Sequence, residues 1–278
     1  MKPRVIVLGE KPQGVSWLKM LIESDLFDII GGVPRKGYKN AWWGSDEFEL
    51  ILKDQKISIF RRDDIKNLDY DIIWSLMYGY IIDPFLIKKA RWFGLNLHES
   101  PLPRFRGCNG FSHSIIENDI TYGTTFQILG KELDSGGIID QEIFPIMVDE
   151  TSKELYERTK AISNIVFKRN MERISQRNFS VRSINVENEE IRNRSSLSEM
   201  KDLSRYSGNS FRNIVRALDF IPFEPAYSWE GGKKFYYFIN NSYNRLHHPG
   251  GPRLIIKMQE DEYKQIYPLF IPEYSWLK

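Results

Sequence analysis

Residues 94–103 read GLNLHESPLP, and this stretch decides the expected fold. Its apolar first half predicts a buried strand on which Asn96 and His98, two residues apart, point to the same face. Pro101 and Pro103 exclude a helix behind them and end the strand there. Because polar side chains at the end of a buried strand cost free energy unless a site uses them, we interpret Asn96 and His98 as candidate functional residues.

A second motif, LDSGG at residues 133–137, places a carboxylate 36 residues after the histidine. The chain reverses in such an Asp-Ser-Gly-Gly turn, which can hold the Asp134 side chain inward. Taken singly, Asn96 and His98 are more often satisfied structural groups, and Asp134 is more often a turn former. Taken together, an amide, an imidazole and a carboxylate in this order indicate a catalytic site.

The wider motif resembles a known family. Residues 96–107, NLHESPLPRFRG, resemble the Asn-x-His-x-Ser-x-Leu-Pro-x-aromatic-Arg-Gly motif of the folate-dependent formyltransferases. YGTT at residues 122–125 and LDSGGII at residues 133–139 resemble that family's Gly-x-Thr and Asp-x-Gly elements, in the same order and at similar spacing. The resemblance covers residues 1–184 well and residues 208–229 more loosely. It implies an enzyme that takes a formyl group from N10-formyltetrahydrofolate.

The resemblance also implies where the cofactor binds. Residues 76–83, LMYGYIID, resemble the loop that holds the pterin ring of the folate. An apolar loop with few side-chain donors must bind a heterocycle through its main chain. The expected cofactor-binding residues are Leu76, Met77, Tyr78, Gly79, Ile81, Ile82, Asp83 and Gly130.

The resemblance places the trio Asn96, His98 and Asp134 around the formyl group, and the chemistry of these side chains agrees. Attack of an amine on the formyl carbon places negative charge on its oxygen, and loss of one hydrogen-bond donor at such an oxygen costs about 2.7–4 kcal/mol. Asn96 offers an amide donor, and His98 can donate from one ring nitrogen while the other faces a carboxylate. Asp134, or a water molecule bound to it, is the natural acceptor of the amine proton.

Several side chains near these motifs are candidates for binding the acceptor substrate. Arginine binds phosphate in a bidentate manner, so Arg104 and Arg106 could position a nucleotide pyrophosphate, although a structural role is equally favoured for Arg106. Phe105 and Phe111 line a sugar pocket or simply pack. His113 is expected on a helix, where a structural role is favoured over substrate contact.

Lys11 is a further candidate for a substrate phosphate, in the loop GEKPQG at residues 9–14. This loop lacks the Gly-x-Gly-x-x-Gly spacing of dinucleotide-binding proteins, so no NAD is expected. His247 and His248 are adjacent and would diverge on a strand, and no cysteine or carboxylate cluster accompanies them. We therefore expect no metal.

The composition is that of a globular protein. The chain has 278 residues, 41% of them hydrophobic, and a net charge of +2 from 39 basic and 37 acidic residues. This balance does not favour nucleic acid as a partner. No apolar run approaches the ~20 residues that span a bilayer, and the N-terminus is expected to form a strand and not a secretory signal. The single cysteine, Cys108, excludes an intrachain disulfide framework and favours the cytoplasm.

Alternating strand and helix patterns predict an α/β fold, a Rossmann-like, mostly parallel sheet with flanking helices. A helix is expected over residues 15–22, and Asp46 could cap another. In such a sheet ligands bind at the carboxyl ends of the strands, where Tyr78 and His98 emerge. The expected strands are residues 5–8, 27–33, 57–60, 71–75 and 93–98.

Further along, residues 122–129 and 138–146 predict a strand pair that flanks the Asp134 turn. A helix is expected over residues 109–118, and the capping box that begins at Thr151 opens a helix through residue 176. The composition changes near residue 185, so the expected domains are a catalytic domain, residues 1–184, and a small C-terminal appendage, residues 185–278. The appendage is expected to be mostly β after a helix near residues 210–218.

The family divides by acceptor: glycinamide ribonucleotide, initiator methionyl-tRNA, a nucleotide-linked amino sugar, or water. Relatives that act on tRNA carry a longer basic C-terminal barrel, whereas residues 185–278 mix basic residues with acidic ones such as Glu189, Glu190 and Glu224. The hydrolases add an N-terminal regulatory domain, and the glycinamide enzymes usually lack such a tail. We therefore expect a sugar N-formyltransferase acting on a UDP- or dTDP-linked amino-dideoxy sugar for lipopolysaccharide or another surface glycan.

Other functions stay open at this point. A methionyl-tRNA or glycinamide ribonucleotide formyltransferase is the alternative within the family, and a non-catalytic binding module is the alternative from another class. Folate and a nucleotide-linked amino sugar are the expected partners, without nucleic acid or membrane, and a homodimer is left open. The aromatic residues of the appendage either serve an interface or pack onto the catalytic domain.

Overall fold

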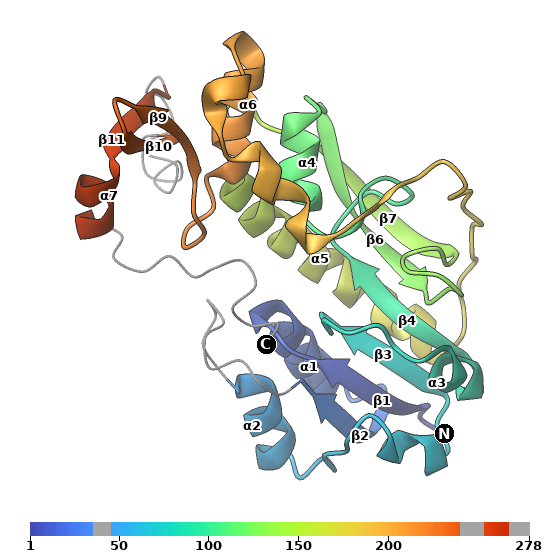
Figure 1. The fold of residues 1–278 in the computed structure, drawn as a ribbon. Helices are drawn as coiled ribbons and strands as arrows, with labels where there is room; N and C mark the ends of the chain where they lie inside the picture. Colours follow the sequence, from blue (N-terminus) through green and yellow to red (C-terminus); the bar gives the residue numbers. More distant parts are fainter. Residues whose placement is uncertain (36–45, 240–252, 267–278) are drawn as a thin grey trace. The chain divides into compact units, whose positions relative to one another are not determined.

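A computed structural model describes residues 1–35, 46–239 and 253–266 (Figure 1). Expectations for the loop through residue 45, for His247 and His248, and for the aromatic residues beyond Ile266 lie outside the described residues. The chain divides into two compact units. The first comprises Met1–Arg104, Gly123–Glu142 and Lys160–Glu189, and the second Phe105–Tyr122, Ile143–Thr159 and Glu190–Lys278.

The elements alternate between strand and helix at first and then change in character. In chain order they are β1 (Arg4–Gly9), α1 (Pro12–Ser24), β2 (Asp28–Pro34), α2 (Glu47–Asp54), η1 (Asp64–Asn67), β3 (Ile72–Leu76), α3 (Pro84–Lys89), β4 (Phe93–His98), β5 (Arg106–Gly107), α4 (Gly110–Ile116), β6 (Thr121–Ile128), β7 (Ile138–Pro145), α5 (Ser152–Ser175), β8 (Ile191–Arg192), η2 (Arg194–Met200), η3 (Leu203–Arg205), α6 (Gly208–Leu218), β9 (Ala226–Glu230), β10 (Lys233–Ile239), β11 (Ile255–Gln259) and α7 (Glu260–Ile266).

The central sheet has the strand order β2-β1-β3-β4-β6-β7. Strand β1 pairs in parallel with β2 and β3, β3 pairs in parallel with β4, and β6 runs antiparallel to β4. This arrangement confirms the expected Rossmann-like, mostly parallel sheet. Strand order reverses between β1 and β3, which is where ligands bind in sheets of this type.

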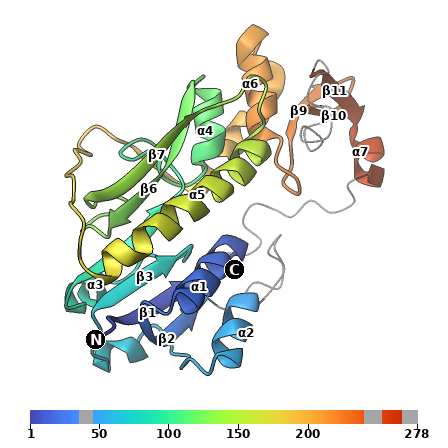
Figure 2. The ribbon, with the colours of Figure 1, turned by 180° about the vertical axis from the view of Figure 1, so that it is seen from behind.

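Alternate residues of the first strands pack on opposite faces of the sheet. Val5 and Trp74 belong to the core with α1 and the part of α5 in the first unit, and Ile6 and Ile73 belong to a second core with α3. Figure 2 shows α1 and α5 on one face of the sheet. The ring centroids of Trp74 and Phe167 lie 5.2 Å apart, which joins α5 to the middle of the sheet.

Two local expectations are wrong. Residues 57–60 form no strand, because the chain makes a single bridge, from Ile59 to Gly32, before it turns at residues 61–64. Asp46 precedes α2, but its side chain makes no capping hydrogen bond to that helix. The capping box at α5 is confirmed: the Thr151 N–H donates to Glu154 Oε2 at 2.9 Å, and the Glu154 N–H donates to Thr151 Oγ1 at 3.3 Å.

The second unit contains the expected small β structure at the C-terminal end. Strands β9, β10 and β11 form an antiparallel sheet, which shares a core with α6. The predicted separation at residue 185 stays a prediction; the second unit also takes in α4 and the first part of α5. Among the described residues, no helix is long and apolar enough to cross a membrane.

Candidate active site

Asn96 and His98 lie at the carboxyl end of β4, as predicted, on one face of the strand. In the antiparallel register with β6, Asn96 stands opposite Gln127 and His98 stands opposite Thr125. Residues directly opposite each other on paired strands share a face. The face therefore carries two amides, an imidazole and a hydroxyl in one compact patch.

Asp134 joins this patch from the turn after β6. Its Oδ2 lies 3.6 Å from His98 Nδ1, and the two side chains are 6% and 15% exposed. The Gln127 Nε2 group donates a hydrogen bond to Asp134 Oδ1 at 3.0 Å. The structure thus brings the predicted carboxylate to the predicted imidazole, with Gln127 holding the other carboxylate oxygen.

Gln127 is a site residue that the sequence reasoning missed. Its side chain is fully buried, and its Oε1 atom has no hydrogen-bond partner among the residues that the structure describes. Its link to the site depends on the register between β4 and β6. The signal that could have found it is the spacing of two residues from Thr125, which places both side chains on one face of a predicted strand.

The turn that carries Asp134 is strained and tightly packed. Asp134 has a φ of 50°, in the left-handed region that side chains other than glycine seldom adopt. A Cβ on Gly136 would lie 1.7 Å from the Ile128 carbonyl oxygen, so only glycine fits against the end of β6. Gly130, an expected cofactor residue, lies against the same turn, where a Cβ would meet Ser135 Oγ at 2.5 Å.

Thr125 ties the segment after His98 to β6. Its hydroxyl donates to the Ser100 carbonyl at 2.7 Å and accepts hydrogen bonds from the Leu102 N–H at 3.1 Å and from Gln141 Nε2 at 2.9 Å. Side chains locked by such hydrogen bonds give a site its fixed geometry. The proline-rich segment behind the catalytic strand is therefore held in place.

The expected cofactor loop follows β3. Leu76 and Ile82 are buried, whereas Ile81 is 73% exposed. Met77 has a φ of 60°, a further left-handed residue at the end of a strand. Burial raises the pKa of Tyr78, so its hydroxyl stays protonated at neutral pH.

Asp83, at the end of this loop, has a structural task. Its Oδ1 atom accepts a hydrogen bond from the Phe85 N–H at 2.9 Å and so caps α3. Lys11 stands directly before α1 in a left-handed conformation, with a φ of 37°. Both positions lie in the first unit, at or beyond the carboxyl ends of strands.

The remaining candidates divide between exposed and buried positions. Arg104 is exposed, whereas Arg106 is 2% exposed and pairs with Ile191 through β5. Phe105 is buried with its ring 5.9 Å from that of Tyr122. Arg104 is therefore more accessible than Arg106 to a phosphate group that approaches from solvent.

His113 is buried on α4. Its Nε2 atom lies 2.7 Å from Ser196 Oγ. Burial, with a smaller contribution from the positive charge of Arg192, lowers the pKa of His113 to about 4. The imidazole is therefore neutral at physiological pH.

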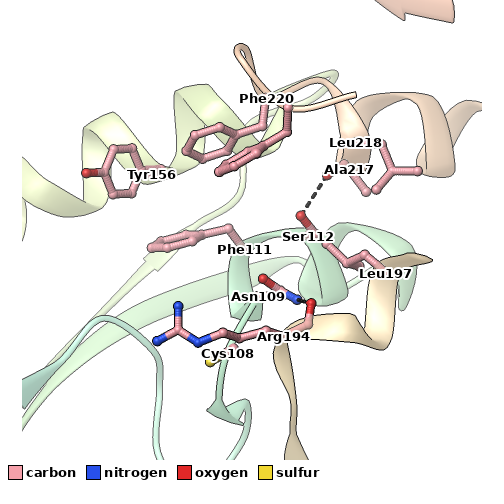
Figure 3. A pocket seen from close by; sticks show the side chains of 11 residues that line it. Cys108, Asn109, Phe111, Ser112, Tyr156, Arg194, Leu197, Ala217, Leu218 and Phe220 are labelled. Carbon is pink, nitrogen blue, oxygen red and sulfur yellow. Dashed lines mark hydrogen bonds between the residues drawn. The ribbon is translucent and has the colours of Figure 1, made fainter. Parts of the chain in front are cut away.

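A pocket lies in the second unit, beside Phe111. Figure 3 shows the aromatic rings of Phe111, Tyr156 and Phe220 around it. The cavity measures about 170 Å³, the size that a single six-membered ring fills. Its lining residues are Cys108, Asn109, Phe111, Ser112, Tyr156, Arg194, Leu197, Ala217, Leu218, Phe220 and Phe223.

The pocket walls are fixed by hydrogen bonds and ring contacts. The Ser112 hydroxyl donates to the Ala217 carbonyl at 2.7 Å, and Asn109 Nδ2 donates to the Arg194 carbonyl at 2.9 Å (Figure 3). The Phe111 and Tyr156 rings meet edge to face, with centroids 5.5 Å apart. An apolar cavity with a few fixed polar groups is typical of a small-molecule site.

In the part of the chain that the structure describes, no group of three His, Cys, Asp or Glu side chains could hold a metal ion. His247 and His248 lie outside that part.

Comparison with known proteins shows which families and structures this chain is similar to. Residues 58–171, which contain Asn96, His98 and Asp134, match the family described as formyl transferase. This part of the chain is thus similar to the formyl transferase family, as the resemblance implied. A methionyl-tRNA formyltransferase from Fusobacterium nucleatum subsp. nucleatum is 32% identical over 167 residues, which are 56% of this chain and 54% of that protein.

The chain matches its curated relatives over about half of their length or less. Its fold, in contrast, is similar to solved structures over most of both chains. WlaRD, a sugar 3N-formyl transferase solved with dTDP and 5-N-formyl-THF, has a TM-score of 0.68 at 24% identity, over 84% of this chain and 86% of that chain. A 4-N formyltransferase from Francisella tularensis has a TM-score of 0.70 at 19% identity, over 84% and 95% of the two chains.

Proposed function

We propose that this protein transfers a formyl group from N10-formyltetrahydrofolate to the amine of a nucleotide-linked amino-dideoxy sugar. The observation that carries the proposal is the approach of Asp134 Oδ2 to His98 Nδ1 at 3.6 Å, beside Asn96 on β4. A carboxylate, an imidazole and an amide in this arrangement serve an acyl transfer that forms charge on an oxygen and releases a proton. The folate supplies the activated formyl group.

Each member of the trio has a separate task in this proposal. With Nδ1 turned toward Asp134, the Nε2 atom of His98 is the ring nitrogen that meets the formyl oxygen. The Asn96 amide donates a second hydrogen bond to the same oxygen, and both bonds strengthen as negative charge develops there. Asp134 orients the imidazole and accepts, directly or through water, the proton that the attacking amine loses. The bond between the formyl carbon and N10 would then break, with that proton passing to N10 of the leaving tetrahydrofolate.

The loop of residues 77–82 fits the pterin ring of the donor. Its exposed side chains are apolar or aromatic, as at Ile81, so polar atoms of the ring would be met by the main chain. Met77 in its left-handed conformation turns the main chain at the start of the loop. A complex with a folate analogue is expected to place the ring within hydrogen-bond distance of these backbone groups.

The pocket beside Phe111 is a proposed nucleobase-binding site within the second unit. Stacking of a base on an aromatic side chain contributes about 1–3 kcal/mol, and the pocket offers the Phe111 and Phe220 rings. Arg104, which is exposed, is the proposed partner of the pyrophosphate. The similarity to WlaRD, a sugar 3N-formyl transferase, over more than four fifths of each chain supports this acceptor class.

Methionyl-tRNA is the second candidate acceptor, because the curated relatives of similar sequence include methionyl-tRNA formyltransferases. Two parallel reactions distinguish these acceptors, each containing the enzyme and N10-formyltetrahydrofolate. One reaction contains a panel of UDP- and dTDP-linked amino-dideoxy sugars, and the other contains charged initiator tRNA. We expect one sugar to gain the mass of a formyl group. Formylated methionyl-tRNA with every sugar unchanged would refute the sugar assignment, and the absence of formyl transfer to any acceptor would favour a non-catalytic binding module.

The cytoplasm is the proposed location of the protein.

A further inference from the structure

Three neighbouring strands of the first unit end at one ion pair. Glu10 follows β1, Arg35 follows β2, and the loop of residues 77–82 follows β3. The strand order β2-β1-β3 brings these three carboxyl ends together at the point where strand order reverses. In parallel sheets this is the crevice in which ligands bind.

The Glu10–Arg35 ion pair is buried to an unusual degree. Arg35 Nη1 donates hydrogen bonds to Glu10 Oε1 at 3.3 Å and to Glu10 Oε2 at 3.1 Å, and the two side chains are 1% exposed or less. Removing two charges from water is costly, so a buried pair is seldom a net source of stability. Because this pair lies beneath the candidate cofactor loop, we interpret it as a device that favours one conformation of that loop.

The loop lies directly on this pair. A Cβ on Gly79 would come within 2.1 Å of Arg35 Nη1 and 2.5 Å of Glu10 Oε1, so the backbone rests against the charged groups themselves. The Arg35 guanidinium also covers the Tyr80 ring, with its Cζ atom 4.0 Å from the ring centroid. Tyr78 in turn meets Tyr80 edge to face, at 5.7 Å between centroids.

The middle of the loop buries little surface of its own. Tyr80 is 45% exposed and Ile81 is 73% exposed, whereas Leu76 and Ile82 at its two ends are buried. The left-handed conformation of Met77 adds a local cost that the surroundings must offset. Contacts with Arg35 and Glu10 thus hold the Gly79 backbone and the Tyr80 ring, beside the packing of Tyr78 on the core that contains Ile6 and Ile73.

We propose that Glu10 and Arg35 are positioning residues that hold the 77–82 loop in the conformation that receives the pterin ring of the formyl donor. The identity of the ligand rests on the proposed function, whereas the restraint that the Glu10–Arg35 pair places on the loop does not. The pair acts through the Gly79 backbone and the Tyr80 ring and needs no contact with the donor. It thus ties donor binding to residues outside the catalytic trio.

The first test is amide hydrogen exchange in the ligand-free protein. In Arg35→Met, exchange at residues 77–82 is expected to rise about tenfold or more, with β4 unchanged, because local opening is no longer opposed. Tyr80→Leu keeps the ion pair and should raise exchange by a smaller factor, whereas Tyr80→Phe keeps the ring and should not. Lys19→Met, which removes an exposed ion pair with Glu47, is the matched control. Unchanged loop exchange in both Arg35→Met and Tyr80→Leu would overturn the proposal.

A second test uses the close approach of Gly79. Gly79→Ala should weaken binding of 5-formyltetrahydrofolate, measured by calorimetry, and should leave the KM for the acceptor unchanged. In the Arg35→Ala background the guanidinium is absent, so the added Cβ has space. Gly79→Ala should therefore weaken folate binding less in this background than in the wild-type protein. An equal loss in both backgrounds would contradict the proposal. Wild-type protein that binds no folate would refute the proposed donor, while the exchange result still decides whether the pair holds the loop.

Discussion

One oxygen of the Asp134 carboxylate accepts a hydrogen bond from Gln127 Nε2, and the other lies 3.6 Å from His98 Nδ1. The bond from Gln127 fixes the direction in which the carboxylate faces the imidazole. At the scale of single residues, the proposed chemistry depends on this arrangement more than on any one charge.

We expect His98→Asn and Asp134→Asn each to lower kcat by about 10²–10⁴, because each removes a proton-transfer or charge-stabilising group. Binding of the nucleotide sugar and the melting temperature should stay near the wild-type values, since both groups act on charge that develops during the reaction. The measurement is steady-state kinetics with calorimetric binding. Asp28→Asn, at an exposed position on β2, is the control. Wild-type kcat in either site variant would contradict the catalytic assignment.

Gln127→Leu tests the hold on Asp134. The substitution removes the donor to Asp134 Oδ1 but keeps a buried side chain of similar volume. We expect kcat to fall about tenfold or more with the KM for the acceptor unchanged. The reason is that displacement of a catalytic group lowers the reaction rate more than it weakens substrate binding. A shifted pH profile of kcat would identify the role as positioning. Equal losses in thermal stability and rate, with the profile unchanged, would instead identify a packing role.

His113 sets a pH dependence of stability. Its folded-state pKa of about 4 lies below the unfolded value of about 6.5, so the unfolded chain binds more protons between these values and stability falls as the pH drops from 6.5 to 4. The shift corresponds to about 3 kcal/mol at its full extent. His113→Gln, which cannot be protonated, should remove this component of the slope in urea unfolding at pH 4–7. An identical slope in the variant would contradict the assignment.

At the scale of elements, the apolar strands β1 to β4 and the capping box of α5 could be predicted because their signals are local. The strand expected over residues 57–60 has a β-branched composition, yet pairing depends on the neighbouring edge of β2, where only Ile59 forms a bridge. The lack of a capping bond from Asp46 is likewise a matter of side-chain direction, which a sequence pattern does not specify.

The approach of Asp134 to His98 could be predicted from the motifs, whereas the place of Gln127 and the pocket could not. Gln127 enters the site through the register of β6 against β4, a relation between segments 30 residues apart. The pocket gathers residues from four separate segments, among them Phe111, Tyr156 and Phe220. Long-range contacts of this kind leave no periodicity in a single sequence.

The capping box provides a test at this scale. Thr151→Ala removes the side-chain acceptor for the Glu154 N–H, and we expect the free energy of unfolding to fall by about 1 kcal/mol. Lys168→Ala, an exposed substitution within α5, should change it by less than about 0.5 kcal/mol. Chemical denaturation of both variants gives the comparison. Equal stabilities of the two variants would show that the cap contributes nothing measurable.

At the scale of the whole molecule, charge balance favours a small acceptor. The net charge is +2, and basic residues in the C-terminal part alternate with acidic ones such as Glu224, which binds Lys234 and Lys201. Lysines paired in this way are poor partners for a phosphate backbone. We expect binding of initiator tRNA to be weak and no tighter than binding of an unrelated RNA, measured by titration at several salt concentrations. Tight binding specific to the initiator would contradict this expectation.

The chain passes between its two units several times, and this path constrains how such a protein can change over evolutionary time. Helix α4 precedes the last crossing and its packing partner α6 follows it, joined by the Ser112–Ala217 hydrogen bond. A recombination event at the end of α5 would therefore supply one wall of the pocket from a foreign gene. Under the nucleobase-binding role proposed for this pocket, lineages that carry the fold are expected to change the bound base through paired point substitutions on both walls, and not by exchanging C-terminal segments.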